Sequence, residues 1–452
     1  MLHTARERGR AHPRRGGPLG AATVAAVALL ATVGTATTAL ASTRAGVASS
    51  LPARQGAAST RTTLPAPKPG VITLQDYYTT GDGSEMQAFI KEFESQNPGY
   101  TVKRDVMPPG NAESQVLTEA SAHQLPDLLM MDNPWVPELA GAGDLVPLES
   151  VGISPSGLTE GAVAAGSYKN VLYGVGFGNN TIGLFYNKKL LAASHVAVPH
   201  TWAQLVTAAK ALTKNGVAGF EVAADNVPGS AVWQFLPFFW TAGGDLEHVN
   251  DAGGVAALTL YQQLAKEGAL PTSVVDEQQN DIAVDFMGGK AAMIVMGPWE
   301  FGPFNSTKGL DYGIAPIPTP RAGMSAVTPL GGEVWVIPKS TPANEALGLK
   351  LLKFLVSPAV TYSWAAANGE IASEKSVSSR LLATVPDDRV FASEIEHARS
   401  RTGEVGLAYP AIETALGTAV QAVILGKATP KQALDTAQVA VVAALKQYHI
   451  TS

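Results

Sequence analysis

Residues 285–300 read DFMGGKAAMIVMGPWE, and this stretch decides the fold. Within it, residues 291–296 form an uncharged apolar run, whose length predicts a strand buried on both faces, as in a parallel α/β sheet. A Gly-Pro pair ends the run. Ligands of open α/β sheets bind beyond the carboxyl ends of the strands. We therefore expect Trp299 and Glu300 to lie at the mouth of a ligand site, although Trp299 could equally pack within its own domain.

The N-terminal residues have the pattern of an export signal. Residues 1–19 contain five arginines, and residues 20–40 are uncharged and rich in Ala, Val and Leu. Because Ala39-Leu40-Ala41 fits a small-x-small cleavage site, we expect residues 1–41 to be a signal peptide that directs the protein out of the cell. An uncleaved membrane anchor is the alternative. Residues 42–70, rich in Ala, Ser, Thr, Pro and Gly, predict a disordered tether.

Composition limits the chemistry of the remaining chain. There is no cysteine, which excludes disulfides, thiolate metal sites and a lipid-anchor cysteine. Of the 32 Lys and Arg and 38 Asp and Glu, nine basic residues and one acidic residue lie in 1–70, which leaves a net charge of −14 on residues 71–452. Nucleic acid is therefore a poor partner, and a neutral or cationic small ligand fits better.

Strand and helix patterns alternate along the chain. The short apolar runs 71–74 and 128–131 predict strands, and residues 101–106 predict another. A helical apolar stripe from Met86 to Phe93 lies between the first strand and residues 101–106. This alternation predicts a parallel, doubly wound sheet. The Gly-rich residues 173–187 predict an extended crossing between two lobes.

Helix-start signals mark the second half of the chain. Thr201 followed by Gln204 predicts a capping box, with the helix ending at Asn215-Gly216. Thr429, followed by Pro430 and then Gln432, repeats the device with proline at the first helical position.

No nucleophile-elbow, metalloprotease or P-loop motif is present, and no cofactor or metal site is expected. A carboxylate pair for glycoside hydrolysis remains an alternative. Aromatic and polar residues instead follow the predicted strands. A sugar suits such a set, because its C–H faces lie on an indole while carboxylates accept from its hydroxyls. Among the aromatics of 231–240 we expect Trp233 to be the exposed one, because Gly229-Ser230 suggests a loop.

Eight segments, taken in order, resemble the carbohydrate-binding extracellular solute-binding proteins of ABC importers, a class that includes maltose-binding protein. The resemblance covers about residues 71–452. The matching segments are FIKEFESQNPGYTV (89–102), PDLLMMDNPWVPELAGAGDLVPL (126–148), YGVGFGNNTIGLFYNKKLL (173–191), VPHTWAQLVTAAKALTKNG (198–216), DFMGGKAAMIVMGPW (285–299), YGIAPIP (312–318), GGEVWVIPKS (331–340) and GKATPKQALDTA (426–437).

The residue patterns and the resemblance together indicate thirteen ligand-binding positions. We expect Trp233 and Trp299 to stack on the ligand, and Asp132 and Glu333 to accept hydrogen bonds from hydroxyls. The full set is Tyr78, Asp82, Asp132, Asn133, Trp135, Asn179, Asn180, Trp233, Trp299, Glu300, Gly331, Gly332 and Glu333.

The resemblance also implies an architecture and a function. The fold class is α/β, a two-lobe periplasmic-binding-protein-like fold of type II, with discontinuous lobes joined by a hinge. The lobes are expected at 71–179 plus 335–378 and at 180–334 plus 379–452. The function implied is capture of a sugar, an oligosaccharide in particular, by a monomeric protein that delivers it to the transmembrane subunits of an ABC permease. A binding protein for a non-sugar solute and a secreted carbohydrate-active enzyme are the alternatives.

Overall fold

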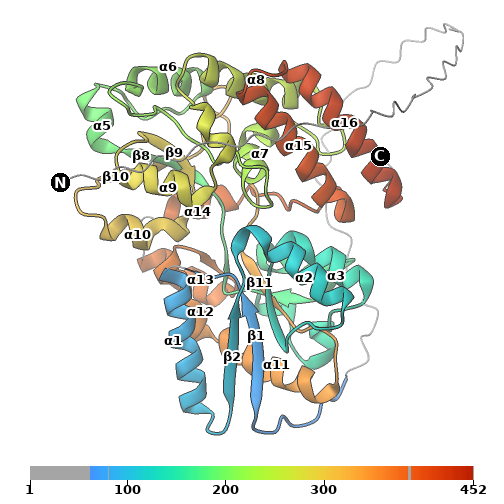
Figure 1. Ribbon diagram of the computed structural model, residues 1–452. Coiled ribbons are helices and arrows are strands. Elements are labelled where there is room, and N and C mark those ends of the chain that lie inside the picture. Colours follow the sequence, from blue (N-terminus) through green and yellow to red (C-terminus); the bar gives the residue numbers. More distant parts are fainter. Residues whose placement is uncertain (1–61, 80, 385–387, 451–452) are drawn as a thin grey trace, which may run out of the picture. The chain divides into compact units, whose positions relative to one another are not determined.

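The computed structural model describes residues 62–79, 81–384 and 388–450 (Figure 1). The predicted signal peptide, 1–41, and residues 42–61 of the predicted tether lie outside the described residues. The rest of the predicted tether, residues 62–70, is mostly exposed but is hydrogen-bonded to the fold. The Thr62 amide donates to the Ser150 carbonyl at 2.9 Å, and the Tyr100 hydroxyl donates to the Pro67 carbonyl at 2.6 Å.

Residues 57–452 form one compact unit with two principal sheets. The first sheet has the order β2-β1-β3-β11-β6. Strand β1 pairs in parallel with β2 and β3, as predicted, whereas β11 pairs antiparallel with β3 and β6. Its strands are β1 (Val71–Asp76), β2 (Thr101–Val106), β3 (Leu128–Asp132), β6 (Gly174–Val175) and β11 (Glu333–Val336).

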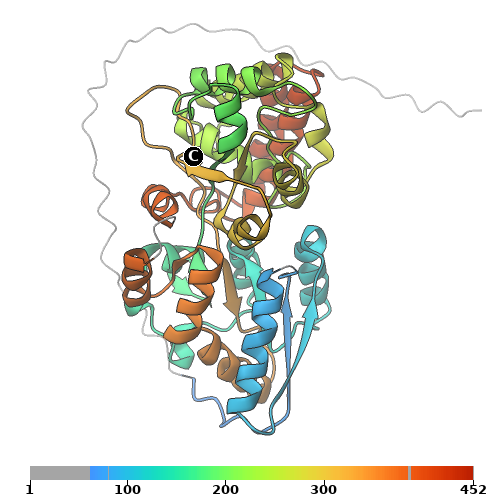
Figure 2. The same cartoon turned by 90° about the vertical axis from the view of Figure 1, so that its left-hand side faces the viewer.

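Alternating side chains of the first sheet supply two separate cores. Leu128 and Met130 of β3 point into one core, and Leu129 and Met131 point into the other. Figures 1 and 2 show α1 alongside β1 and β2. The helices of the first core are α1 (Gly81–Gln96), α11 (Pro342–Leu355) and α12 (Pro358–Asn368), and those of the second are α2 (Ala112–Ser121) and α3 (Val136–Ala142).

The second sheet has the order β10-β8-β9, with β8 (Gly183–Asn187), β9 (Met293–Met296) and β10 (Tyr312–Ala315). Strand β9 is buried on both faces, as its apolar sequence predicts. Met293 and Val295 pack in one core, and Ile294 and Met296 in another. The expected parallel pairing is wrong for its ladder, because β9 pairs antiparallel with β8. Among the described residues, β9 has a parallel contact in the isolated bridge Glu221↔Ile294.

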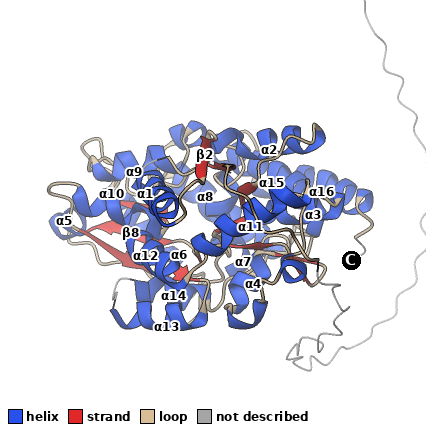
Figure 3. Cartoon of the chain, turned by 90° about the horizontal axis from the view of Figure 1, so that it is seen from below, coloured by secondary structure: helices blue, strands red, loops and turns tan. Residues whose placement is uncertain are grey.

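Helices cover both faces of the second sheet. Figure 3 shows the strands (red) surrounded by helices (blue). Both predicted capping boxes are confirmed, at Thr201 and Thr429. Residues 406–424 are long and apolar enough to cross a membrane, yet side chains such as Leu416 are buried in the core. The helices are α5 (Lys188–Ala193), α6 (Trp202–Leu212), α7 (Ala231–Thr241), α8 (Ala252–Lys266), α9 (Gln279–Met287), α10 (Phe301–Ser306), α15 (Tyr409–Ile424) and α16 (Pro430–Gln447).

Three chain segments run side by side between the two sheets. The first connects β6 to β8 through β7 (Gly178–Asn179), which confirms the predicted crossing. Asn180 pairs with Gly331 of the second segment, and β12 (Ile371–Ala372) of the third pairs with β7. The lobe boundaries given above stay predictions. The remaining elements are α4 (Glu160–Ala165), α13 (Lys375–Thr384), α14 (Asp388–Ile395), β4 (Ser167–Tyr168) and β5 (Val171–Leu172).

Candidate ligand-binding site

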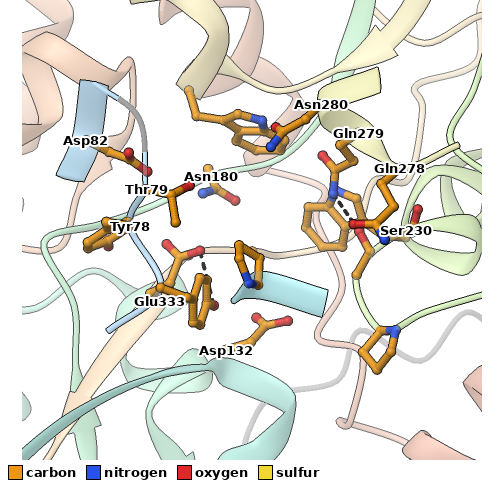
Figure 4. Close-up of a pocket in the computed structure, with 18 of the residues that line it drawn as sticks. Tyr78, Thr79, Asp82, Asp132, Asn180, Ser230, Gln278, Gln279, Asn280 and Glu333 are labelled. Atoms are coloured by element: carbon orange, nitrogen blue, oxygen red, sulfur yellow. Dashed lines mark hydrogen bonds between the residues drawn. The ribbon is translucent and has the colours of Figure 1, made fainter. Parts of the chain in front are cut away.

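A pocket of ≈ 240 Å³ is lined by segments that belong to both sheets (Figure 4). From the first sheet come the loop after β1 and the 3₁₀ turn Asn133–Trp135 after β3. From the region around the second sheet come residues 227–230, the first turn of α7, residues 278–280, and the 3₁₀ turn Pro298–Glu300 after β9. The pocket thus lies beyond the carboxyl ends of β1, β3 and β9, where α/β sheets bind ligands.

The pocket wall contains eleven of the thirteen predicted positions. Their contact with a ligand stays a prediction, since their placement shows only that they can reach the same space. The eleven are Tyr78, Asp82, Asp132, Trp135, Asn180, Trp233, Trp299, Glu300, Gly331, Gly332 and Glu333.

The other two positions, Asn133 and Asn179, lie outside the pocket wall and hold one of the crossing segments. The Asn133 side-chain amide donates to the carbonyls of Leu330 (3.3 Å) and Gly332 (3.2 Å). The Asn179 amide donates to the Gly331 carbonyl at 3.2 Å. Both are buried, so their role in this structure is to position the 330–332 turn that borders the pocket.

An ion pair joins Asp132, at the end of β3, to Arg401. The Arg401 guanidinium donates to the two carboxylate oxygens at 2.8 and 2.5 Å, a bidentate geometry that favours both charges. Burial is the largest single influence and opposes the charge of Arg401, but Asp132, Tyr409 and Glu413 together outweigh it, so the Arg401 pKa is raised above its ordinary value. A ligand hydroxyl that donates to Asp132 would therefore share this carboxylate with Arg401.

Trp233 belongs to the first turn of α7, which corrects the loop expected after Gly229-Ser230. Its side chain is only 4 % exposed. The Arg401 guanidinium lies 4.5 Å from its ring centroid, within cation–π range. Arg401 and Trp233 therefore line the pocket as a stacked pair, with the guanidinium lying over the indole ring.

Trp299 and Glu300 follow β9 directly, as the apolar run and its Gly-Pro stop predict. Trp299 is half-buried, lines the pocket and packs against both cores of the second sheet. Its position is therefore compatible with both roles considered above, stacking on a ligand and packing within its own domain. Glu300 is 6 % exposed, and its carboxylate has no hydrogen-bond or ion-pair partner among the described residues. Burial, and to a lesser extent Asp82, raise the pKa of Glu300 to about 7.

Two further carboxylates line the pocket where crossing segments end: Glu333, which is half-buried, and Glu370, which is buried. The Tyr77 hydroxyl donates to Glu333 at 3.4 Å. Glu370 accepts from the Trp364 indole N–H at 3.0 Å and from the Asn180 amide at 3.4 Å. Burial raises the pKa of Glu333 to about 7, with Asp132 adding to the shift, and burial together with Glu333 raises that of Glu370 to about 8.

Several pocket residues were not found from the sequence. Trp364 comes from α12 and packs on Tyr78 with ring centroids 4.5 Å apart. A weak signal existed for some of them: Tyr77 and Thr79 flank Tyr78 at the end of β1, and Glu370 follows the Asn-Gly stop of α12. Arg401 carries no local signal, because it lies in an irregular polar segment. The missed polar and aromatic side chains are Tyr77, Thr79, Ser230, Gln278, Gln279, Asn280, Trp364, Asn368, Glu370 and Arg401.

Away from the pocket, Glu221, Glu277 and Asp285 place one carboxylate oxygen each within 4.8 Å of one another. Such a group could hold a cation. The Lys290 ammonium donates to Asp285 at 2.9 Å, and burial together with Glu277 raises the pKa of Glu221 to about 7. With Glu221 protonated and Asp285 paired with Lys290, the cluster keeps one uncompensated carboxylate, that of Glu277.

Comparison with known proteins places this geometry in a family. A galactooligosaccharide-binding protein of Bacillus subtilis (strain 168) is 26% identical over 327 residues, which cover 69% of this chain and 75% of that protein. The GacH receptor of Streptomyces glaucescens, crystallised unliganded and with acarbose, is similar with a TM-score of 0.73 and 26% identity, over 83% of this chain and 98% of that one. An ABC transporter solute-binding protein of Thermotoga lettingae, bound to α-D-tagatose, is similar with a TM-score of 0.76 and 25% identity, over 83% of this chain and 99% of that one.

The model of one protein family, described as bacterial extracellular solute-binding protein, matches residues 88–392. The solved structures have the two-lobe architecture of type II periplasmic binding proteins, which confirms the fold class expected from the sequence. Since the family match spans more than half of the sequence, this chain belongs to the bacterial extracellular solute-binding proteins.

Proposed function

We propose that this protein captures an oligosaccharide outside the cell for an ABC importer. The observation that carries the proposal is the make-up of the pocket wall, which combines flat aromatic rings with carboxylates and amides from both sheets. A sugar offers apolar C–H faces to the rings and hydroxyl donors to the acceptors, so it can satisfy both kinds of group at once. The binding-protein names of the relatives support a binder rather than an enzyme.

The proposed mechanism is hinge closure. Asp82, Asp132 and Trp135 approach the pocket from the first sheet, whereas Trp233 and Trp299 approach it from the second. A ligand that touches both groups has more contacts in a closed arrangement than in an open one, and this differential affinity shifts the population toward closure. The three crossing segments are the natural hinge, because they are the connections between the sheets.

The proposal includes partners and a location. The closed form would be recognised by the transmembrane subunits of an ABC permease, with the protein acting as a monomer at the outer face of the membrane. The proposal also includes export directed by residues 1–41, with cleavage after Ala41, because these residues have the basic, apolar and small-residue order of an export signal. Intact mass of the secreted protein checks the cleavage; recovery only in membranes with residues 1–41 attached would favour the membrane anchor.

A thermal-shift screen of the purified protein against mono- and oligosaccharides, followed by calorimetry, tests the proposal. A ligand at 100 times its Kd adds ~2.7 kcal/mol to the free energy of unfolding, so a true ligand is easily seen. We expect saccharides to raise the melting temperature without being cleaved. No shift with any saccharide, or turnover of a chromogenic glycoside panel, would reject capture of a sugar as the function.

A further inference from the structure

We infer that the protein binds one Ca²⁺ ion outside the pocket, held by the carboxylates of Glu221, Glu277 and Asp285. Each of the three places one oxygen within 4.8 Å of the other two. Oxygens so spaced lie no farther than about 2.8 Å from a common centre, which is close to the ~2.3–2.6 Å of Ca²⁺–oxygen bonds. Small shifts of the side chains would bring all three to bonding distance. The inference does not depend on which ligand the pocket binds.

Glu221 supplies the observation that points to a bound ion. Its residue is 4 % exposed, and its Oε2 atom is buried without a hydrogen-bond partner among the described residues. The Oε2 atom of Glu277 is likewise buried and without such a partner. Buried side-chain acceptors nearly always have a partner, and ionised carboxylates cannot satisfy one another because they only accept. A cation between the two side chains satisfies both.

The three carboxylates stand on segments that are held in place by the fold. Glu221 lies beside β9, where its amide donates to the Met293 carbonyl at 3.0 Å. Asp285 belongs to α9, which packs in the same core as β9. Glu277 directly follows the 3₁₀ turn Thr272–Asp276. Ligands that come from three anchored segments are already positioned, so less conformational freedom is lost when the ion binds.

The ligand set favours Ca²⁺ over other metals. All three donors are carboxylate oxygens, which hard cations prefer, and no His or Cys of the described chain belongs to the group. Mg²⁺ releases its water shell reluctantly and usually takes about one or two carboxylates, whereas Ca²⁺ accepts about six to eight oxygens in a flexible geometry. Glu277 and Asp285 are half-buried, so the site is open to solvent on their side. Water can therefore supply the remaining ligands.

The charge of the group fits a divalent ion. The exposed Lys290 ammonium donates to one oxygen of Asp285 at 2.9 Å, which leaves the other oxygen for the metal. Lys290 compensates one of three ionised carboxylates. A divalent cation compensates the other two, so the loaded site is neutral, as a partly buried group of charges should be.

A bound ion would also stabilise part of the pocket wall. Glu277 directly precedes residues 278–280, which line the pocket. Its carbonyl accepts from the Asp225 amide at 3.1 Å, close in sequence to Glu221. An ion on the Glu277 side chain therefore ties the wall segment to α9 and to the edge of β9. We expect Ca²⁺ to slow amide hydrogen exchange in 221–225 and 277–285, measured without saccharide.

Calorimetric titration of the purified, chelator-treated protein with Ca²⁺ and with Mg²⁺ tests the inference. We expect one Ca²⁺ per chain with a Kd of ~10⁻⁴ M, as in extracellular calcium modules. Mg²⁺ should bind at least about tenfold more weakly, because three direct carboxylates suit it poorly. Absence of Ca²⁺ binding at ~10⁻² M would reject the site, since such modules are saturated there. Equal affinity for Mg²⁺ would reject calcium as its occupant.

Variants locate the ion. Glu221→Gln should weaken Ca²⁺ binding by at least about tenfold, because even outer-shell partners of a metal are worth ~10–100-fold in affinity. Asp285→Asn, nearer the surface, should do the same and serves if Glu221→Gln does not fold. Wild-type affinity in either folded variant would overturn the assignment.

Asp276→Asn is the matched control. Asp276 is an exposed carboxylate next to Glu277 in the chain, and it does not belong to the group of three. Its removal should change the Ca²⁺ affinity by less than about threefold, because an exposed charge is screened by salt. A loss as large as that of Glu221→Gln would show diffuse attraction by an acidic surface and overturn the site.

Discussion

Trp299 divides its indole between the pocket and the two cores of the second sheet, and a single substitution can measure both roles. Trp299→Ala should weaken binding of the saccharide identified in the screen by roughly thirtyfold, because an aromatic hot spot contributes ~2 kcal/mol or more. The melting temperature without ligand should also fall, since the ring packs against both cores. Calorimetry on the folded variant measures the first effect, and thermal unfolding measures the second.

Trp202 provides the matched control, because it too is half-buried and lies in α6, outside the pocket. Its indole N–H donates to the Pro318 carbonyl at 2.9 Å. Trp202→Ala should lower stability while leaving affinity unchanged. A Trp299→Ala variant that behaves in the same way would show that Trp299 is a packing residue only.

Glu370 makes the stability of the ligand-free protein depend on pH. Its pKa is raised by burial and by Glu333 to about 8 in the folded state, against ~4.3 in an unfolded chain. The folded state therefore holds a proton that the unfolded state has lost between these values. The stabilisation is fully present below pH ~4.3 and disappears as the pH rises through about 8.

We expect the free energy of unfolding, measured by urea titration without ligand, to decrease from pH 5 to 8, and Glu370→Gln to flatten that decrease. Glu149, an exposed carboxylate outside the pocket, is the control. Glu149→Gln should retain the wild-type pH profile. An unchanged profile in Glu370→Gln would mean that Glu370 is ionised in the folded protein.

At the scale of elements, the turn that carries Gly331 and Gly332 connects the sheets and borders the pocket. Gly332 has φ +105°, a region that L-residues rarely adopt, and an added Cβ would lie 2.6 Å from the Gly178 carbonyl oxygen. Gly332→Ala should therefore lower the free energy of unfolding through both strain and a clash between two crossing segments. Chemical denaturation measures the loss.

Gly243 separates the two contributions, because it has φ +90° and open space around its Cβ position. Gly243→Ala should show the conformational strain alone and cost less than Gly332→Ala. If both variants lose the same free energy of unfolding, the clash between the crossing segments does not contribute to the cost of Gly332→Ala.

Elements also show where sequence patterns succeed and fail. The capping box at Thr201 is readable because both of its hydrogen bonds join residues three positions apart. Trp233 was misplaced because Gly229-Ser230 is ordinarily a loop signal, yet α7 begins directly after it, at Ala231, and also accommodates Pro237. Burial of all eleven α7 side chains provides tertiary packing strong enough to override that local preference.

At the scale of the whole molecule, hinge closure predicts a change in dimensions. A saturating saccharide should reduce the radius of gyration measured by solution X-ray scattering, because the ligand stabilises the arrangement in which both sheets contact it. Binding confirmed by calorimetry with an unchanged radius of gyration would contradict closure. The same data, compared across protein concentrations, check the proposed monomer.

The sequence by itself determined the strand and helix order, the capping boxes, the double burial of β9 and eleven positions of the pocket wall. The first three features rest on local spacing. The pocket positions rest on the rule that strand ends converge on a ligand site together with the family resemblance, which alone indicated Tyr78, Asp82 and Asn180. Only the tertiary structure decided that β9 pairs antiparallel with β8, that Asn133 and Asn179 hold a turn, and that Arg401 reaches Asp132. The reason is physical: Asp132 and Arg401 are 269 positions apart, and no local pattern specifies a contact made only when two sheets and their crossing segments assemble.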